Sequence, residues 1–109
     1  LVRYAGASGD FNPLHHDHAF AREAGLPDVM AHGMLSAGLL ASALTGWFGA
    51  GSVMRYAVRF RSPVWPGDRL VATCDAIVAR EDGLADLTLS LRRGDDVVLT
   101  GESRGRLRQ

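Results

Sequence analysis

The fold of this chain is decided by the stretch GMLSAGLLASALTGWF, residues 33–48, which contains no charged side chain. The uncharged run continues to Met54 and is long enough for a bilayer span. Glycines and hydroxyl residues interrupt it, however, and the helix-forming part from Met34 to Phe48 is shorter than the roughly 20 residues that a span needs. We therefore predict a helix over 34–48 that is buried on all sides within the protein, because it lacks a polar stripe.

An alternating segment follows this helix. The even positions of 53–61 are apolar and the odd ones include arginines: Met54, Tyr56, Val58 and Phe60 on one side, Arg55, Arg59 and Arg61 on the other. A period of two predicts a strand with one buried face. Three more strands are predicted, from Leu70 to about Arg80, from Leu84 to Arg92, and from Val97 until the pattern fades near Leu107.

Short turns separate these strands, at Pro66-Gly67-Asp68, Glu81-Asp82-Gly83 and Arg93-Gly94-Asp95. Strands joined by short turns pair antiparallel, so we infer an α+β fold in which a curved antiparallel sheet wraps around one central helix. The length of 109 residues suits a single domain, residues 1–109. Four strands cover such a helix incompletely, and its burial requires a further N-terminal strand, a second subunit, or both.

The composition excludes several classes of partner and chemistry. Twelve basic and twelve acidic residues cancel, so no net positive field attracts nucleic acid or an anionic membrane. All the basic residues are arginine, which removes mechanisms that need a lysine. The single Cys74 cannot form an internal disulfide, and no signal peptide is visible at Leu1, so we predict a cytoplasmic protein.

Polar groups concentrate before the helix, in the segment SGDFNPLH, residues 8–15. Gly9 permits an unusual backbone angle and Pro13 restrains the residue before it, so the side chains of this loop can be aimed. Asp10, Asn12 and His15 are the candidate catalytic residues. The alternative is a capping loop in which Asp10 and Asn12 only satisfy backbone groups. Downstream, we expect Asp17 to cap a short helix through Ala24.

A second candidate site is His32-Gly33-Met34, at the start of the long helix. A helix N-terminus presents unpaired N–H groups and a partial positive charge, and a glycine lets a ligand oxygen approach the backbone. The three residues therefore outline a substrate-binding oxyanion site. The alternative is that Gly33 only lets the helix begin beneath a packed loop.

The histidines also raise the question of a metal. His15, His16 and His18 lie near Asp10 in the sequence, and His32 could approach them in space. Zinc sites usually place histidines at helical or hairpin spacing, and these three form no i, i+4 pair. We predict no metal, and we expect His16 and His18 to be solvated.

The segment YAGASGDFNPLH, residues 4–15, followed by Ala31-His32-Gly33-Met34, resembles the hydratase motif of MaoC-like (R)-specific enoyl-CoA hydratases and 3-hydroxyacyl-thioester dehydratases. The similarity continues through YAVRFRSPVWPGD, residues 56–68, and so covers nearly the whole chain. The resemblance implies a hot-dog fold, in agreement with the pattern of helix and strands. It also implies a strand before Leu1, so we expect residues 1–109 to be one hot-dog domain without its N-terminal strand segment.

The resemblance implies that Asp10 and His15 form a catalytic pair, that Asn12 supports their geometry and that the Gly33 N–H binds a thioester carbonyl. The implied reaction is hydration of a trans-2-enoyl thioester, or dehydration of an (R)-3-hydroxyacyl thioester, carried by coenzyme A or acyl carrier protein. It needs a base, a proton donor and a stabiliser of enolate charge, and no cofactor. Members of this family form their pockets between two hot-dog units, so the resemblance implies a dimer, with a homodimer favoured over a heterodimer.

Two alternatives stay open. A hot-dog thioesterase usually carries an acid on its central helix, whereas Met34 to Trp47 contains none. A non-catalytic acyl-binding subunit of a heterodimer would not need the trio of Asp10, Asn12 and His15. The arginine face of the strand over 53–61 could meet a carrier phosphate, although a solvated surface is the simpler explanation.

Overall fold

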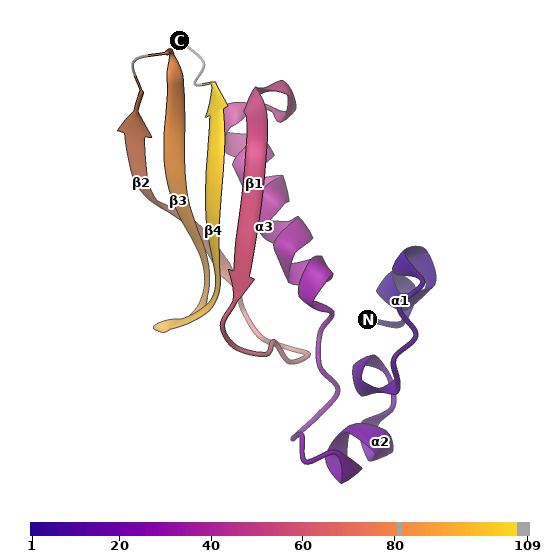
Figure 1. The fold of residues 1–109 in the computed structure, drawn as a ribbon. Helices are drawn as coiled ribbons and strands as arrows, with labels where there is room; N and C mark the ends of the chain where they lie inside the picture. Colours follow the sequence, from indigo (N-terminus) through magenta and orange to yellow (C-terminus); the bar gives the residue numbers. More distant parts are fainter. Residues whose placement is uncertain (81, 107–109) are drawn as a thin grey trace.

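The computed structural model describes residues 1–80 and 82–106 (Figure 1). Its helices and strands, in chain order, are α1 (Val2–Ser8), η1 (Pro13–His15), α2 (His18–Glu23), α3 (Gly33–Phe48), η2 (Ala50–Ser52), β1 (Val53–Phe60), β2 (Val71–Ala79), β3 (Leu84–Arg93) and β4 (Asp96–Arg106). The predicted helix and four strands are confirmed to within about two residues at their described ends. Glu81 and Leu107, at a predicted turn and a predicted strand end, lie outside the described residues.

The four strands form one antiparallel sheet in the order β1-β4-β3-β2. The β3–β4 hairpin turns at Gly94, where φ is +58°, a left-handed value that glycine adopts without strain. The Pro66-Gly67-Asp68 turn is also present, with φ at Gly67 of +87°. The sheet and the helix together make the α+β hot-dog fold.

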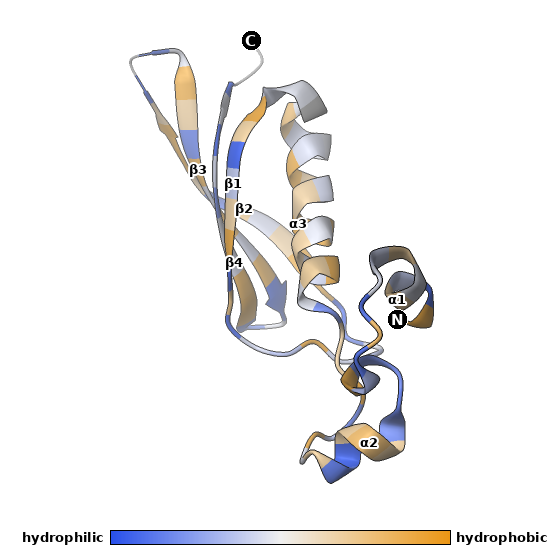
Figure 2. Ribbon diagram, turned by 45° about the vertical axis from the view of Figure 1, so that its right-hand side comes forward, coloured by the Kyte–Doolittle hydropathy of each residue, from blue (hydrophilic) through white to orange (hydrophobic). Residues whose placement is uncertain are grey.

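The core lies between α3 and the sheet (Figure 2). Leu40 and Leu44, one turn apart on α3, are fully buried against the alternate side chains Leu87, Leu89 and Leu91 of β3. The helix approaches β4 closely at Gly101, because a Cβ at that position would lie 3.2 Å from Cδ2 of Leu40. The period of two in β3 thus places its leucines on the helix side, as predicted.

The far side of α3 is not enclosed, which corrects the expectation of burial on all sides. Only one face of the helix packs on the sheet, while Met34, Leu39 and Trp47 are exposed. The strand β1 shows the same effect, since Met54 and Phe60 of its predicted buried face are exposed. Periodicity identified the faces correctly, but the layer that would cover them is not formed by the described residues.

The helices α1 and α2 lie toward the N-terminal end of α3 and away from the four strands (Figure 1). The radius of gyration is 15.9 Å, against about 13 Å for a compact domain of about 100 residues. Asp17 caps α2 through a hydrogen bond from the Phe20 N–H, as predicted. Helix α1 was not predicted, because seven residues that bury only Ala5 are too short for a periodic pattern.

Among the described helices, none combines the length and the apolar character that crossing a bilayer requires.

Candidate active site

The loop between α1 and η1 is shaped by local hydrogen bonds. Gly9 ends α1 in the left-handed conformation, with φ of 76°. The Asn12 side chain accepts a hydrogen bond from the Leu14 N–H at 3.0 Å, and Pro13 begins η1 with its fixed φ. One Asp10 carboxylate oxygen, Oδ1, accepts from the Asn12 N–H at 3.2 Å. The predicted capping bonds are therefore present, and they leave Oδ2 of Asp10 available.

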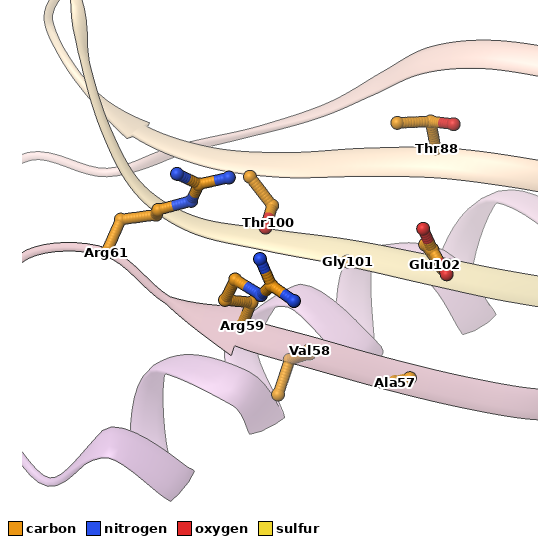
Figure 3. A pocket seen from close by; sticks show the side chains of 8 residues that line it. All are labelled: Ala57, Val58, Arg59, Arg61, Thr88, Thr100, Gly101 and Glu102. Carbon is orange, nitrogen blue, oxygen red and sulfur yellow. The ribbon is translucent and has the colours of Figure 1, made fainter.

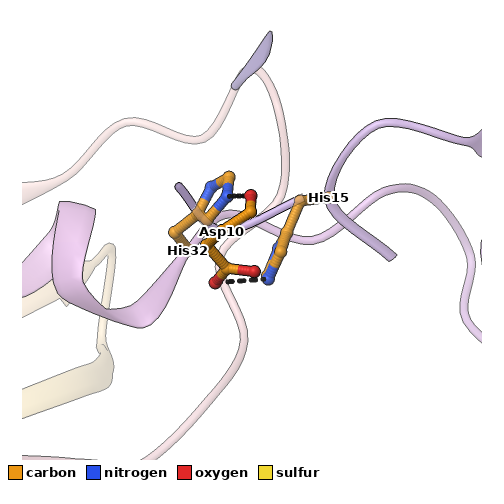
Figure 4. A group of neighbouring side chains, drawn as sticks. All are labelled: Asp10, His15 and His32. Carbon is orange, nitrogen blue, oxygen red and sulfur yellow. Dashed lines mark hydrogen bonds and ion pairs between the residues drawn. The ribbon is translucent and has the colours of Figure 1, made fainter. Parts of the chain in front are cut away.

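Asp10 and His15 face each other across this loop (Figure 4). The distance from Asp10 Oδ2 to His15 Nε2 is 3.6 Å. The other ring nitrogen, Nδ1, lies 2.6 Å from the carbonyl oxygen of Met30. A carbonyl only accepts hydrogen bonds, so Nδ1 carries the proton in the neutral ring and Nε2 presents its lone pair toward Asp10. His15 is buried, whereas the Asp10 side chain is 51% exposed and open to water or a ligand.

His32 completes the cluster from the start of α3. Its Nε2 lies 3.0 Å from the backbone carbonyl oxygen of Asp10. Its ring stacks on that of His15, with centroids 3.8 Å apart, and the Tyr4 ring covers it at 4.8 Å. The His32 side chain thus contacts both members of the candidate catalytic pair, Asp10 and His15.

The N-terminus of α3 opens onto an apolar cavity of about 310 Å³. Its lining residues come from the segment before α3, from α3 itself and from the β1 end, the loop after it and β4: Met30, Ala31, Gly33, Ser36, Phe60, Arg61, Ser62, Pro63, Val64 and Val98. Within the described residues no acceptor bonds the N–H groups of Gly33 and Met34. Of the three predicted substrate-binding residues, Gly33 lines this cavity, whereas His32 is buried and does not line it, and Met34 is exposed.

Gly33 lies in close contact with Phe60. A Cβ at this position would lie 3.1 Å from Cε1 of Phe60, closer than side-chain atoms normally approach. The Phe60 ring therefore forms one wall directly beside the Gly33 N–H, and the glycine keeps that N–H accessible from the cavity.

The loop that contributes Pro63 and Val64 to the lining is held by an ion pair between Asp68 and Arg93. Asp68 accepts hydrogen bonds from the Trp65 N–H at 2.8 Å and from Arg93 Nη1 at 2.7 Å. These two bonds, the backbone one first, hold the pKa of Asp68 below its ordinary value of 3.8. Arg93 also donates to the Pro63 carbonyl, and the Val64 carbonyl accepts from the Ala31 N–H. The loop after β1 is thus tied to the segment that carries the site.

The cluster of Asp10, His15 and His32 has donor atoms within 4.8 Å of one another, a spacing that invites a metal. Zinc bound by two histidines would lie about 2.0–2.1 Å from each nitrogen, in the plane of each ring. The two rings are stacked with planes only 21° apart, and planes so nearly parallel do not meet at that distance. This arrangement does not suit one ion held by both histidines, and a metal-free site stays a prediction.

The remaining predicted positions lie outside the cluster. His16 and His18 are exposed, and His18 pairs with Asp28 at 2.6 Å. Arg59 and Arg61 border a shallow hollow of about 400 Å³ on the sheet face opposite α3, beside Thr100 (Figure 3). Asp10, His15 and His32 do not line this hollow.

Sequence reasoning missed three contributors: the Met30 carbonyl, the Phe60 wall and the Asp68–Arg93 clamp. Every residue has a backbone carbonyl, so the sequence could not indicate that the carbonyl of Met30 would bond to His15. The spacing of Pro66-Gly67-Asp68 marked a turn, but not its arginine partner on β3.

Comparison with known proteins identifies the family of this chain. The MaoC like domain family matches residues 1–81. The chain is 36% identical over 107 residues to the (R)-specific enoyl-CoA hydratase of Aeromonas caviae, covering 94% of this chain and 80% of that protein. It is 41% identical over 89 residues to 3-hydroxyacyl-thioester dehydratase X of Mycobacterium tuberculosis, covering 82% of this chain and 30% of that protein.

A mitochondrial 3-hydroxyacyl-[acyl-carrier-protein] dehydratase of Arabidopsis thaliana is 37% identical over 81 residues, which cover 74% of this chain. The chain spans about half the length of that plant protein, 49%. Among solved structures, an (R)-hydratase from A. caviae involved in PHA biosynthesis superposes with a TM-score of 0.86 at 35% identity, covering 98% of this chain and 84% of that one. With the family match over most of its length and these relatives, the chain belongs to the MaoC-like domain family.

Proposed function

We propose that this protein hydrates trans-2-enoyl thioesters and, in the reverse direction, dehydrates (R)-3-hydroxyacyl thioesters. The observation that carries the proposal is the 3.6 Å separation of Asp10 Oδ2 and His15 Nε2. His15 is also bonded to the carbonyl of Met30, which lines the same cavity as Gly33. A carboxylate, an imidazole and a free helix N-terminus are the three groups that this reaction needs. The names of the relatives support the same chemistry.

The pair is arranged to act on one water molecule. At 3.6 Å apart, both atoms can contact a single water oxygen at about 2.8 Å. As the water oxygen bonds to C3 of the enoyl group, one of its protons passes to the pair, and a proton from the pair bonds to C2. The Nδ1–H bond to Met30 keeps His15 Nε2 as the atom that exchanges this proton. Because one water supplies both additions, they occur on one face of the double bond.

The negative charge that develops on the thioester oxygen meets the start of α3. The Gly33 N–H is the first of a helix of 16 residues, so it adds a helix dipole to a hydrogen bond. Catalytic roles for Asp10 and His15, a supporting role for Asn12 and an oxyanion role for Gly33 thus form one proposal. Coenzyme A and acyl carrier protein both remain as carriers.

We infer in addition that the protein works as a homodimer. Leu39 lies on the uncovered side of α3 and Met34 and Trp47 are exposed toward its two ends, so the described residues leave apolar surface of this helix uncovered. A second copy would cover such a face by two-fold symmetry. The cytoplasmic location also stays a prediction.

The test is a spectrophotometric assay with crotonyl-CoA and longer trans-2-enoyl-CoA esters, followed by chiral analysis of the product. We expect loss of the enoyl absorbance and an (R)-3-hydroxyacyl product. His16→Ala and His18→Ala are controls that should keep most activity, and chelator should have no effect. Release of free thiol without hydration would identify a thioesterase, and no turnover of any ester would favour the non-catalytic subunit.

A further inference from the structure

His32 has an unsatisfied atom in a well-packed place. Its side chain is 2% exposed, and Nδ1 is the one buried side-chain nitrogen or oxygen among the described residues that has no hydrogen-bond partner. Such an atom costs free energy, and an apolar ring of similar size would avoid that cost. His32 makes no capping bond to α3 and does not line the cavity. Its retention therefore requires another reason.

The second ring nitrogen of His32, Nε2, provides that reason. Nε2 lies 3.0 Å from the Asp10 carbonyl oxygen, and since a carbonyl only accepts, Nε2 carries the proton. This is the only hydrogen bond, among the described residues, that joins the loop over 9–12 to a distant part of the chain. The other bonds of the loop reach at most five residues along the sequence. His32 thus ties the Asp10 backbone to the rigid start of α3.

The same ring also supports His15. The two imidazoles stack with centroids 3.8 Å apart and planes 21° apart, so His32 lies against the face of the His15 ring while the Met30 carbonyl holds its edge. One side chain therefore contacts both members of the catalytic pair, Asp10 by a hydrogen bond and His15 by its face (Figure 4).

We infer that His32 is a positioning residue that sets the separation of Asp10 Oδ2 from His15 Nε2, and that it is not a ligand for the substrate. This role rests on the proposed function, because positioning matters for a pair that shares one water. Misplacement of a catalytic group by about 1 Å can cost about a hundredfold in rate.

Two variants separate the bond from the stack. His32→Phe keeps an aromatic face against His15 and removes the donor to Asp10. His32→Gln keeps an N–H near the place of Nε2 and removes the aromatic face. We expect His32→Phe to lower kcat for crotonyl-CoA about a hundredfold with little change in KM, and to unfold at the same or a higher Tm because the unsatisfied Nδ1 is gone. The kcat of His32→Gln should be about tenfold higher than that of His32→Phe.

His16→Phe is the matched control. His16 Nε2 also lies near a loop carbonyl, that of Phe11 at 3.2 Å, but His16 is exposed and contacts neither member of the pair. The same substitution there should leave kcat and KM near their original values.

The tautomers give a readout that does not depend on activity. Two-bond ¹H–¹⁵N correlation spectra of the histidine rings should show neutral His32 with its proton on Nε2 and neutral His15 with its proton on Nδ1. The His15 signals should shift in His32→Phe and stay in His16→Phe. If His32 carries its proton on Nδ1, or if an active parent protein keeps its kcat in folded His32→Phe, the inference is overturned. If the parent shows no hydration but the tautomers and shifts are as expected, the positioning role stands and the proposed function falls.

Discussion

Replacing Gly33 by proline removes one backbone N–H from the site and adds a side-chain ring beside Phe60. Gly33 is the first residue of α3, a position where proline is favoured because its N–H has no partner within the helix. The preceding residue, His32, has φ of −62° and ψ of 135°, which is the extended conformation that a residue before proline requires. The structure therefore predicts that Gly33→Pro folds.

The expected loss follows from the role of the N–H. Removing one donor to a developing oxyanion costs about 10²–10³-fold in kcat, or about 2.7–4 kcal/mol. The proline ring also adds a Cβ where Phe60 Cε1 lies only 3.1 Å away. Gly33→Ala adds the same carbon and keeps the N–H, so it measures the steric part alone. Because the Phe60 side chain is exposed and can shift, we expect Gly33→Ala to lose much less activity.

The assay is crotonyl-CoA hydration by both variants, with circular dichroism and thermal unfolding to establish that each is folded. The ratio of kcat between Gly33→Ala and Gly33→Pro isolates the contribution of the N–H. A folded Gly33→Pro protein that turns over as fast as Gly33→Ala would refute the assignment of this N–H to the oxyanion.

Four further predictions follow from the fold and the site. Asp10→Asn and His15→Ala should each reduce hydration about 10²–10⁴-fold, and the double variant should lose little more, because the two groups act as a unit; additive losses in steady-state kinetics would contradict a shared water. The hydrogen bonds that depress the pKa of Asp68 below 3.8 stabilise the fold above about pH 4, and this stabilisation is lost as the pH falls through the lower pKa of the folded state. In urea titrations, the free energy of unfolding of Asp68→Asn should therefore fall less between neutral and acid pH than that of the parent protein. An equal fall in both proteins would argue against the Asp68–Arg93 clamp. Leu40→Ala should lower the free energy of unfolding by about 2–5 kcal/mol in urea titration, since Leu40 is fully buried, and a loss below about 1 kcal/mol would mean that the core at Leu40 is looser than described. Sedimentation should find a dimer at micromolar concentration that Leu39→Ala weakens, and an active, stable monomer would remove the dimer proposal.

The sequence by itself predicted the long helix, the order of the four strands and the candidate reacting groups. The uncharged stretch from Gly33 to Phe48 predicted the helix, and the alternation in β3 predicted which leucines face it, because burial periodicity is a local property of each element. The segment over 8–15 identified Asp10 and His15 as candidates, because their residue types and their spacing across a loop restrained by glycine and proline are read directly from the sequence.

Only the tertiary structure decided how those groups are oriented. The proton on His15 is fixed by the carbonyl of Met30, fifteen residues away, and the Asp10 backbone is fixed by His32, twenty-two residues away. Met54 lies on the apolar side of β1 as predicted, but it is exposed. Periodicity shows which side of a strand is apolar and does not show whether another layer covers that side. Backbone carbonyls have no residue identity, and contacts between distant segments depend on the path of the whole chain. Residue types therefore fix which chemistry is available, while the packing of distant segments fixes which atom performs it.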